Sequence, residues 1–223
     1  MIICFTIGRM YMELQQIKDI KTFVQLKTKD DRSGHGMDHI ERVVRNAQKI
    51  AQTEDCDHFV VTAAAYLHDI ADDKLVTDQE QAYQEMITFL QTHQISTERI
   101  KHIMYIIQNL SFSQELEGGK ATLSIEGKIV QDADRLDAMG AIGIIRTIYY
   151  GGHKGNKIYD PEIPPRTLQK KSDYRNESTV INHFYEKILL LNERLNTAYA
   201  KKIGQKRQRF LEDFLEEFLE EWD

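Results

Sequence analysis

The sequence predicts an all-α protein, and three observations lead to that prediction. The 223 residues include only 3 prolines and 12 glycines, so long elements are rarely interrupted. Apolar residues recur three and four positions apart, which is the spacing of an amphipathic helix. No strand-like stretch is longer than a hairpin. A chain of this length can bury one sizeable core, and we expect a single domain over residues 1–223.

The first half of the chain is expected to form five helices. Asp38 is the expected N-cap of the second helix, and Ser96 is the expected cap of the fifth. The third helix is almost wholly apolar, so it should be buried on all sides. We expect these helices at residues 13–27, 38–51, 59–71, 78–92 and 96–110.

The second half is expected to contain a helical segment, a loop and two terminal helices, at residues 125–148, 151–176, 180–195 and 197–222. The loop contains all three prolines and several basic residues, and loops of this length are usually functional or disordered. We interpret it as a lid with basic contacts to an anion; a solvated mobile loop is the alternative. In the last helix, a basic run at 201–209 and an acidic run at 216–221 are interpreted as solvated faces.

Composition restricts the partners of the protein. A net charge of −6 argues against broad contact with a nucleic acid polymer, which needs a basic face. No apolar run approaches the 18 residues of a membrane span, and the start of the chain lacks the basic region of a signal peptide. Cys4 and Cys56 have no metal-binding spacing, and reduced thiols indicate a cytoplasmic protein. Met12 is an alternative start to Met1.

The stretch from Ala63 to Lys74 contains a candidate metal site. It runs from an apolar helix body into His68-Asp69. Asp72 and Asp73 follow three and four residues after Asp69, so on a helix the three carboxylates share one face. A nitrogen donor beside several oxygen donors suits a divalent metal ion. Because His-Asp dipeptides are common, a surface pair or a helix cap is the alternative.

Two further positions could complete such a site. His39 shares a helical face with apolar residues, so it points inward at the first turn of a buried face; a hydrogen-bonded core histidine is the alternative. Asp134 lies in an apolar segment, where an unpaired carboxylate is costly to bury. We favour a cation as its partner. The alternatives are pairing with Arg135 or another arginine, or an outward-facing Asp132. Two imidazoles and two carboxylates suit one divalent transition ion and leave positions open for water and a phosphate oxygen.

The order His39, His68-Asp69, Asp134 resembles the HD superfamily of metal-dependent phosphohydrolases. The resemblance extends to the amino-acid sequences of three core motifs. These are His39-Ile40-Glu41-Arg42-Val43, His68-Asp69-Ile70-Ala71-Asp72-Asp73 and Ala133-Asp134-Arg135-Leu136-Asp137. The whole chain, with Tyr149-Tyr150-Gly151-Gly152 and Asn182-His183-Phe184-Tyr185-Glu186-Lys187, resembles the small bacterial YpgQ/YedJ-like branch. The similarity covers roughly residues 30–222. It implies an HD-domain helical bundle, with core motifs at about 30–150 and extra C-terminal helices at about 177–222.

The resemblance also implies roles for individual residues. The implied metal ligands are His39, His68, Asp69 and Asp134, holding one divalent ion per chain; Mn²⁺ is the expected ion, with Fe²⁺, Co²⁺, Ni²⁺, Zn²⁺ or Mg²⁺ as alternatives. Asp72 and Asp73 match paired acids that serve the attacking water in stringent-response nucleotide hydrolases. Asp137 stands where those enzymes carry a histidine, and it is the alternative to Asp134 as the fourth ligand. The candidate substrate contacts are His35, Lys74, Arg135, Asp137, Arg146, Lys154 and Arg175.

The expected reaction is hydrolysis of nucleoside or deoxynucleoside triphosphates to the monophosphate and pyrophosphate. A nucleotidase, a (p)ppGpp-type hydrolase and a non-catalytic nucleotide-binding HD module are the alternatives. A di-iron oxygenase would need additional histidines, and beyond His35 the sequence shows no such cluster near the motifs. The expected partner is a small nucleotide, and the chain is expected to be a monomer or a homodimer. The aromatic stripe on the last helix is expected to pack within the chain rather than across a dimer.

Overall fold

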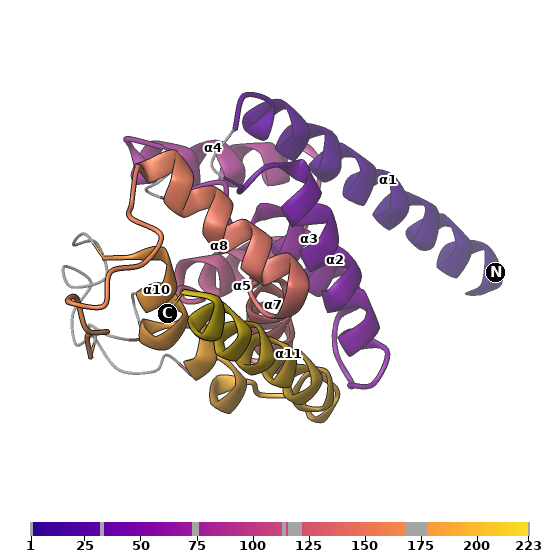
Figure 1. Ribbon diagram of the computed structural model, residues 1–223. Helices are drawn as coiled ribbons and strands as arrows, with labels where there is room; N and C mark the ends of the chain where they lie inside the picture. Colours follow the sequence, from indigo (N-terminus) through magenta and orange to yellow (C-terminus); the bar gives the residue numbers. More distant parts are fainter. Residues whose placement is uncertain are drawn as a thin grey trace. The chain divides into compact units, whose positions relative to one another are not determined.

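The computed structural model describes residues 2–31, 34–72, 76–112, 115, 122–167 and 178–222, with side chains from residue 8 onward (Figure 1). Regular secondary structure in these ranges is helical, and they contain no strand, which confirms the predicted all-α class. The chain divides into two compact units, residues 1–110 with 123–130, and residues 111–122 with 131–223. Helix α7 (Ile125–Asp137) begins in the first unit and ends in the second. The single-domain organisation stays a prediction.

The first unit is organised around a short central helix. This helix, α3, packs against α1, α2 and α5, and every residue from Phe59 to Leu67 is buried. Its almost wholly apolar sequence predicted that burial. The helices of this unit are α1 (Ile2–Thr28), α2 (Met37–Ala51), α3 (His58–Leu67), α4 (Gln79–Thr92) and α5 (Thr97–Gln108).

Side-chain caps fix where two of these helices begin. The Asp57 carboxylate accepts hydrogen bonds from the backbone N–H groups of Phe59 and Val60, at 3.0 and 3.2 Å, and so begins α3. The Arg99 guanidinium donates to the same carboxylate, which ties the start of α3 to α5. Ser96 caps α5 by accepting from the backbone N–H of Arg99, as predicted.

Boundaries of α1, α2 and α3 in the first unit differ from the prediction. Helix α1 begins at Ile2, well before the predicted start at residue 13. The N-cap of α2 is Gly36 rather than Asp38, whose carboxylate instead accepts from Arg42 one turn later, at 2.8 Å. Helix α3 ends at Leu67, so the predicted helix was too long by its last turn. The chain continues through hydrogen-bonded turns to Ala71, and this change moves the His-Asp pair from a helix into a turn.

The described part of the second unit contains the end of α7 and five further helical elements. The segment predicted at residues 125–148 is divided into two helices, and the second starts at Gly140, whose φ is +71°. The helix predicted at 180–195 is a short α-helix followed by two 3₁₀ turns. The elements are α8 (Gly140–Lys154), α10 (Val180–Glu186), η1 (Ile188–Leu190), η2 (Asn192–Arg194) and α11 (Ala198–Trp222).

The loop predicted at residues 151–176 begins later than expected. Helix α8 continues through Lys154, and Gly155 ends it in the left-handed conformation, with φ +73°. Gly151 is therefore helical, and it lets α8 approach α10 closely, because a Cβ built there would lie 2.4 Å from Cγ2 of Val180. Residues 168–176 of the predicted loop lie outside the described ranges.

The aromatic residues of α11 pack within the second unit. Phe214 lies 5.9 Å from Phe184 between ring centres, and Phe218 and Trp222 lie 5.9 and 5.3 Å from Tyr159. The predicted intramolecular packing of this stripe is confirmed for these three residues. A bilayer-spanning helix needs about 20 apolar residues, and none of the helices in the described ranges meets the requirements of such a span.

Candidate metal centre

Two histidines from different parts of the first unit bring their ring nitrogens together. His39 lies in the first turn of α2, where its backbone N–H donates to the carbonyl of Gly36, and its side chain is 1% exposed. His68 directly follows α3, and its side chain is 4% exposed. The two Nε2 atoms are 3.3 Å apart. The packing of α2 against α3 therefore joins positions that are 29 residues apart in sequence.

Asp69 adds a carboxylate oxygen to the two nitrogens. It lies in the turn after α3, where the N–H of Ile70 donates to the Leu67 carbonyl and the N–H of Asp72 donates to the Asp69 carbonyl, at 3.1 and 3.0 Å. Oδ2 of Asp69 is 3.2 Å from Nε2 of His39 and 3.3 Å from Nε2 of His68. The three donor atoms form a nearly equilateral triangle.

The triangle has the dimensions of one face of a metal coordination shell. Neighbouring ligand atoms that share an ion at about 2.1 Å are roughly 3.0–3.4 Å apart. Oδ2 of Asp69 is buried, yet no hydrogen bond of acceptable geometry reaches it, although two imidazole nitrogens lie close by. A cation in front of the triangle would satisfy this oxygen and both nitrogens together. The residues present therefore fit a divalent transition ion.

A backbone carbonyl orients the His68 ring. Nδ1 of His68 lies 2.8 Å from the carbonyl oxygen of Ala65. Because a carbonyl can only accept, Nδ1 carries the proton and Nε2 presents its lone pair to the triangle. Such a second hydrogen bond is typical of histidines that bind metals.

The charge state of Asp69 also suits a ligand. Burial alone would raise the pKa of its carboxyl group. Positive charge on the imidazoles of His68 and His39 outweighs that effect and holds the pKa of Asp69 well below its usual value of 3.8, and a cation beside the carboxylate would act in the same direction. The carboxylate is therefore ionised at neutral pH, which metal coordination requires.

His35 and Asp72, which were also predicted to belong to the site, lie in the same unit as the triangle. The ring of His35 lies edge-on to that of His39, with ring centres 6.2 Å apart. Asp31, which sequence reasoning missed, accepts from the backbone N–H of His35 at 3.0 Å and so holds this turn; the sequence contains no motif that would reveal that role. The helical face proposed for Asp69 and Asp72 was wrong, since Asp69 lies in a turn and Asp72 directly follows that turn, outside any helix.

The catalytic role of Asp72 stays a prediction. Asp73 and Lys74 lie outside the described residues.

Asp132 in the second unit is a structural residue, and its outward-facing alternative was wrong. It is 0% exposed. Its carboxylate accepts four hydrogen bonds at 2.8 Å, from the backbone and side chain of Asn196 and from the backbone and hydroxyl of Thr197. These bonds hold α7 to the turn that begins α11. Sequence reasoning had no way to find partners that lie 64 and 65 residues away.

The other aspartates of α7 lie in the same unit. Asp137 is buried and accepts from Nη1 of Arg146 at 3.1 Å. Asp134 is half-buried. The assignment of Asp134 as a metal ligand, and of Asp137 and Arg146 as substrate contacts, stays a prediction.

The remaining basic candidates have partners of their own. Arg135 is buried, and its guanidinium donates to the carboxylate of Glu115 and to the carbonyl of Arg194. Lys154 ends α8, with its ammonium 5.7 Å from the ring centre of Tyr150. Contact with substrate stays a prediction for Arg135 and Lys154, and Arg175 lies outside the described residues.

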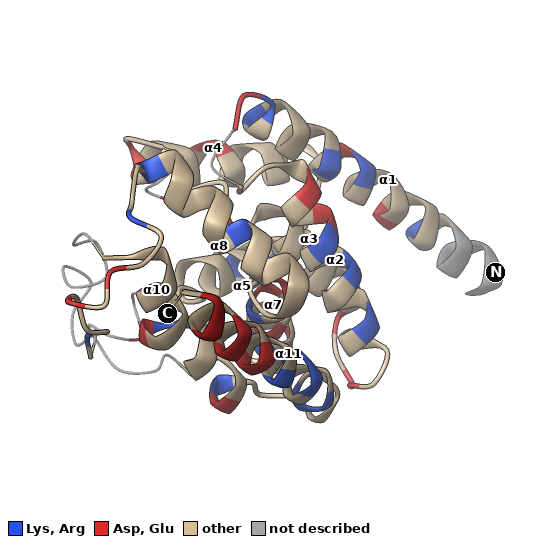
Figure 2. Ribbon diagram, viewed as in Figure 1, with Lys and Arg blue, Asp and Glu red and all other residues tan. Residues whose placement is uncertain are grey.

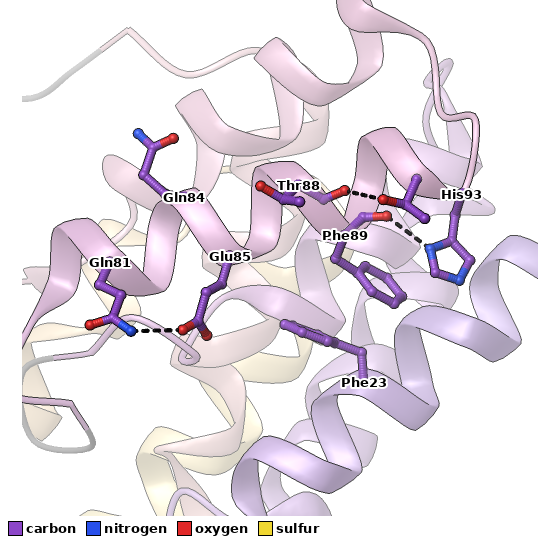
Figure 3. A pocket seen from close by; sticks show the side chains of 8 residues that line it. Phe23, Gln81, Gln84, Glu85, Thr88, Phe89 and His93 are labelled. Carbon is purple, nitrogen blue, oxygen red and sulfur yellow. Dashed lines mark hydrogen bonds between the residues drawn. The ribbon is translucent and has the colours of Figure 1, made fainter.

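A separate groove of about 470 Å³ lies between α1 and α4 (Figure 3). Phe23 of α1 and Phe89 of α4 stack there with ring centres 4.4 Å apart, and His93 continues the stack at 4.1 Å from Phe89. The Gln81 amide donates to Glu85 on the same helix at 3.0 Å. Since the aromatic rings pack against one another and none of the triangle residues lines the groove, we do not assign it to the metal centre.

Comparison with known proteins gives a consistent result. Residues 36–139 match the HD domain family. Protein YpgQ of Bacillus subtilis is 35% identical over 199 residues, which span 89% of this chain and 90% of YpgQ. The matched segment contains the triangle of His39, His68 and Asp69, and it also contains Asp134.

Solved structures show the same similarity. A Lactobacillus plantarum protein superposes with a TM-score of 0.86 at 41% identity, covering 93% of this chain and 97% of that one. An HD-superfamily hydrolase of Bacillus thuringiensis gives 0.74 at 40% identity, with 94% and 98% covered. YpgQ of Bacillus subtilis in complex with ADP gives 0.74 at 33% identity, with 94% and 96% covered. These matches over nearly the whole chain, together with the paired histidine and aspartate after α3, show that the chain belongs to the HD superfamily of hydrolases.

Proposed function

We propose that this protein is a metal-dependent phosphohydrolase that converts nucleoside or deoxynucleoside triphosphates to the monophosphate and pyrophosphate. The observation that carries the proposal is the triangle of His39 Nε2, His68 Nε2 and Asp69 Oδ2, whose buried oxygen has no hydrogen bond of acceptable geometry. A divalent ion is the partner that this donor set suits. The ADP complex of YpgQ supports a nucleotide as the ligand.

We propose Asp134 as the fourth ligand and Mn²⁺ as the ion. Asp134 is a carboxylate that could group with the two imidazoles around one ion. It follows Val130 by one turn of α7, the helix that begins in the same unit as the triangle. A mixed set of two imidazoles and two carboxylates suits Mn²⁺, Fe²⁺, Co²⁺ or Zn²⁺. We also propose a cytoplasmic location, consistent with the free thiol of Cys56.

The proposed reaction is balanced by one water molecule. The oxygen of water bonds to the α-phosphorus, the bond from that phosphorus to the bridging oxygen breaks, and pyrophosphate leaves. An ion bound at the site supplies Lewis acidity, which acidifies water and polarises a phosphoryl oxygen. Asp72, whose backbone N–H is bonded to the Asp69 carbonyl, is proposed to accept the proton of the water. His35, beside the His39 ring, is proposed to contact the substrate.

Metal binding is tested first and without turnover. We expect the purified protein to bind one Mn²⁺ per chain, measured by elemental analysis after dialysis, and to melt at a higher temperature with the ion than with a chelator. His68→Ala should abolish both effects. His58→Ala is the matched control, because His58 is an exposed histidine at the other end of α3. Full metal content in His68→Ala would contradict the site. Two irons per chain would favour an oxygenase.

Turnover is tested by a screen of nucleoside tri-, di- and monophosphates and (p)ppGpp, with phosphate and pyrophosphate measured separately. Pyrophosphate release from triphosphates is the expected result. Phosphate release from monophosphates would favour a nucleotidase, and tight nucleotide binding without any product would favour a binding module. Asp72→Asn should keep the full metal content while lowering kcat by about 10²–10⁴-fold, the usual contribution of a general base.

A further inference from the structure

Three helices of the second unit bring two arginines to one buried carboxylate. Asp137, the last residue of α7, is 2% exposed and accepts from Nη1 of Arg146 on α8 at 3.1 Å. Arg207 of α11 donates through Nη1 to the carbonyl of Leu136, the neighbour of Asp137, and the Asp137 carboxylate attracts its charge. The fold thus gathers two guanidinium groups that are distant in sequence.

Gly140 makes room for the Arg207 side chain. Gly140 begins α8 with a φ of +71°, and a Cβ built there would lie 3.1 Å from Cγ and 3.3 Å from Cβ of Arg207. The aliphatic part of Arg207 therefore lies against the start of α8, and its guanidinium reaches the end of α7. The basic run at 201–209 was predicted to be a solvated face, and Arg207 departs from that prediction because it is half-buried.

The positive charge of this cluster exceeds the negative charge of the carboxylate that the two arginines share. The guanidiniums carry two positive charges, and Asp137 carries one negative charge. Burial lowers the pKa of Arg207, and nearby negative charge, chiefly on Asp137, opposes that effect without cancelling it. Because a partly buried charge is costly unless it is paired, an anion beside the two guanidiniums would stabilise the cluster.

The half of α11 that contains Arg207 is basic. Figure 2 shows Lys and Arg on the N-terminal half of α11, and Asp and Glu on its C-terminal half. From Ala198 to Phe210 the sequence of α11 contains no acidic residue, and its basic residues there are Lys201, Lys202, Lys206, Arg207 and Arg209. The helix dipole favours the reverse order of charges, so this order does not stabilise α11 itself. The neighbouring positive charges would attract an anion to Arg207.

We propose that Arg146 and Arg207 together bind phosphate groups of the nucleotide substrate. The inference rests on the proposed function for the identity of the ligand. A planar guanidinium presents paired N–H donors that match two oxygens of a phosphate. Both arginines are half-buried, so solvent screens their charges less than those of exposed residues, and part of each side chain stays accessible to an anion.

The position of the pair along α7 agrees with this role. Asp137 follows Asp134, the proposed fourth metal ligand, by three residues, so the two lie on one side of the helix and about 4.5 Å apart along its axis. A polyphosphate chain with one phosphate near Asp134 therefore has another within reach of the arginines beside Asp137.

The first experiment measures binding of pyrophosphate by isothermal titration calorimetry, with a chelator present so that no metal ion contributes. We expect the wild type to bind with a dissociation constant below about 1 mM. Arg207→Gln and Arg146→Gln should each weaken binding by about 10–100-fold, the range of a hydrogen bond to a charged group. Arg209→Gln is the matched control, since it removes the same charge from an exposed position on the same helix and should weaken binding by at most about fivefold. Weaker binding by the wild type, or unchanged affinity in Arg207→Gln, overturns the proposal.

Folding is checked separately, because Arg207 also donates to the Leu136 carbonyl. Circular dichroism and the melting temperature without ligand show whether Arg207→Gln is folded. Arg207→Lys is the second variant; it keeps the positive charge and loses the paired donors. It should weaken pyrophosphate binding by about tenfold, the loss of one hydrogen bond to a charged group. Wild-type affinity in a folded Arg207→Lys overturns the proposal.

A second series separates recognition of phosphate from recognition of the rest of the nucleotide. Deoxyadenosine and its triphosphate are titrated under the same conditions. Arg207→Gln should weaken binding of the triphosphate by the same factor as that of pyrophosphate and leave binding of the nucleoside unchanged. An equal loss for nucleoside and triphosphate overturns the proposal, because it shows a disturbed site for base or sugar.

Failure of the inference and failure of the proposed function give different results. If the wild type hydrolyses no triphosphate but Arg207→Gln loses its affinity for pyrophosphate, the proposed function fails and the anion site stands. If the wild type hydrolyses triphosphates and Arg207→Gln keeps its full affinity for pyrophosphate, the inference alone fails.

Discussion

Substitutions of Asp132 and Asp134 test whether one aspartate of α7 stabilises the fold while the other binds the metal ion. We expect Asp132→Ala to destabilise the metal-free protein strongly while leaving metal binding intact. Asp134→Ala should abolish metal binding while leaving the stability of the metal-free protein nearly unchanged. The two residues stand two positions apart in one helix, so each is the matched control of the other.

The magnitude for Asp132 follows from its contacts. The substitution removes a buried carboxylate that accepts four hydrogen bonds at 2.8 Å, two of them from Thr197, which is itself buried. A bond to a charged group contributes about 1.5–3 kcal/mol, and a buried donor left without a partner costs about 1–3 kcal/mol. Asn196 is half-buried, so water can replace some of the hydrogen bonds that it would lose to the Asp132 carboxylate. We expect a loss of about 3–5 kcal/mol. Asp132→Asn keeps one side-chain oxygen as an acceptor, so its free energy of unfolding should fall by about half as much.

The assay is chemical unfolding with and without metal. In the presence of a chelator, Asp132→Ala should lower the free energy of unfolding by the amount above, and Tm by roughly 10 °C for a chain of this size. Mn²⁺ at about 100 times its dissociation constant should add about 2.7 kcal/mol to the wild type and to Asp132→Asn. Asp134→Ala should gain almost nothing from the ion. Wild-type stability in Asp132→Asn, or full metal stabilisation in Asp134→Ala, would refute the assignment.

Two further predictions concern the second unit. Gly151→Ala should destabilise the protein by about 1–3 kcal/mol, because its methyl group would overlap Val180, which a Cβ would approach to 2.4 Å. Gly152→Ala is the control in the same helix; nothing lies within 4 Å of its Cβ position, and the change should stabilise α8 by about 0.5–1 kcal/mol.

The buried Glu186 should make stability depend on pH. Burial would raise the pKa of its carboxyl, and hydrogen bonds from Arg166 outweigh this and lower it below the usual 4.5. A lowered pKa contributes stability above the unfolded value that is lost as pH falls through the folded value. In urea unfolding, the free energy of unfolding of Glu186→Gln should therefore differ most from that of the wild type near pH 7. This difference should become smaller below pH 4.5, and a difference that does not depend on pH would contradict the role of Glu186.

Local sequence signals predicted the elements better than their ends. The burial of α3 followed from its apolar composition, and Ser96 caps α5 with its side-chain oxygen, as predicted. Asp38 is an equally good cap by residue type, yet it pairs with Arg42 while Gly36 begins the helix. Such competition between neighbouring partners is decided by three-dimensional context, which a single sequence does not contain.

The site could be predicted only in part, and for a similar reason. The inward face of His39 and the His68-Asp69 pair are local patterns, and the structure brings all three together. The surroundings of Asp132 and Arg135 depend on Asn196, Thr197 and Glu115, which are distant in sequence. From the sequence alone, the structural aspartate Asp132 and the proposed ligand Asp134 in the same helix look alike.

The hydrogen bond from His68 to Ala65 limits which residues can stand at position 68. Ala65 is 0% exposed, and its carbonyl belongs to the last turn of α3, which has no further helical N–H to accept. The side chain at this position must donate at one end and offer a lone pair at the other. A neutral imidazole does both, whereas a carboxylate could face a cation only by leaving that carbonyl unsatisfied. The hydrogen bond to Ala65 and the proposed metal coordination would thus each favour histidine at this position.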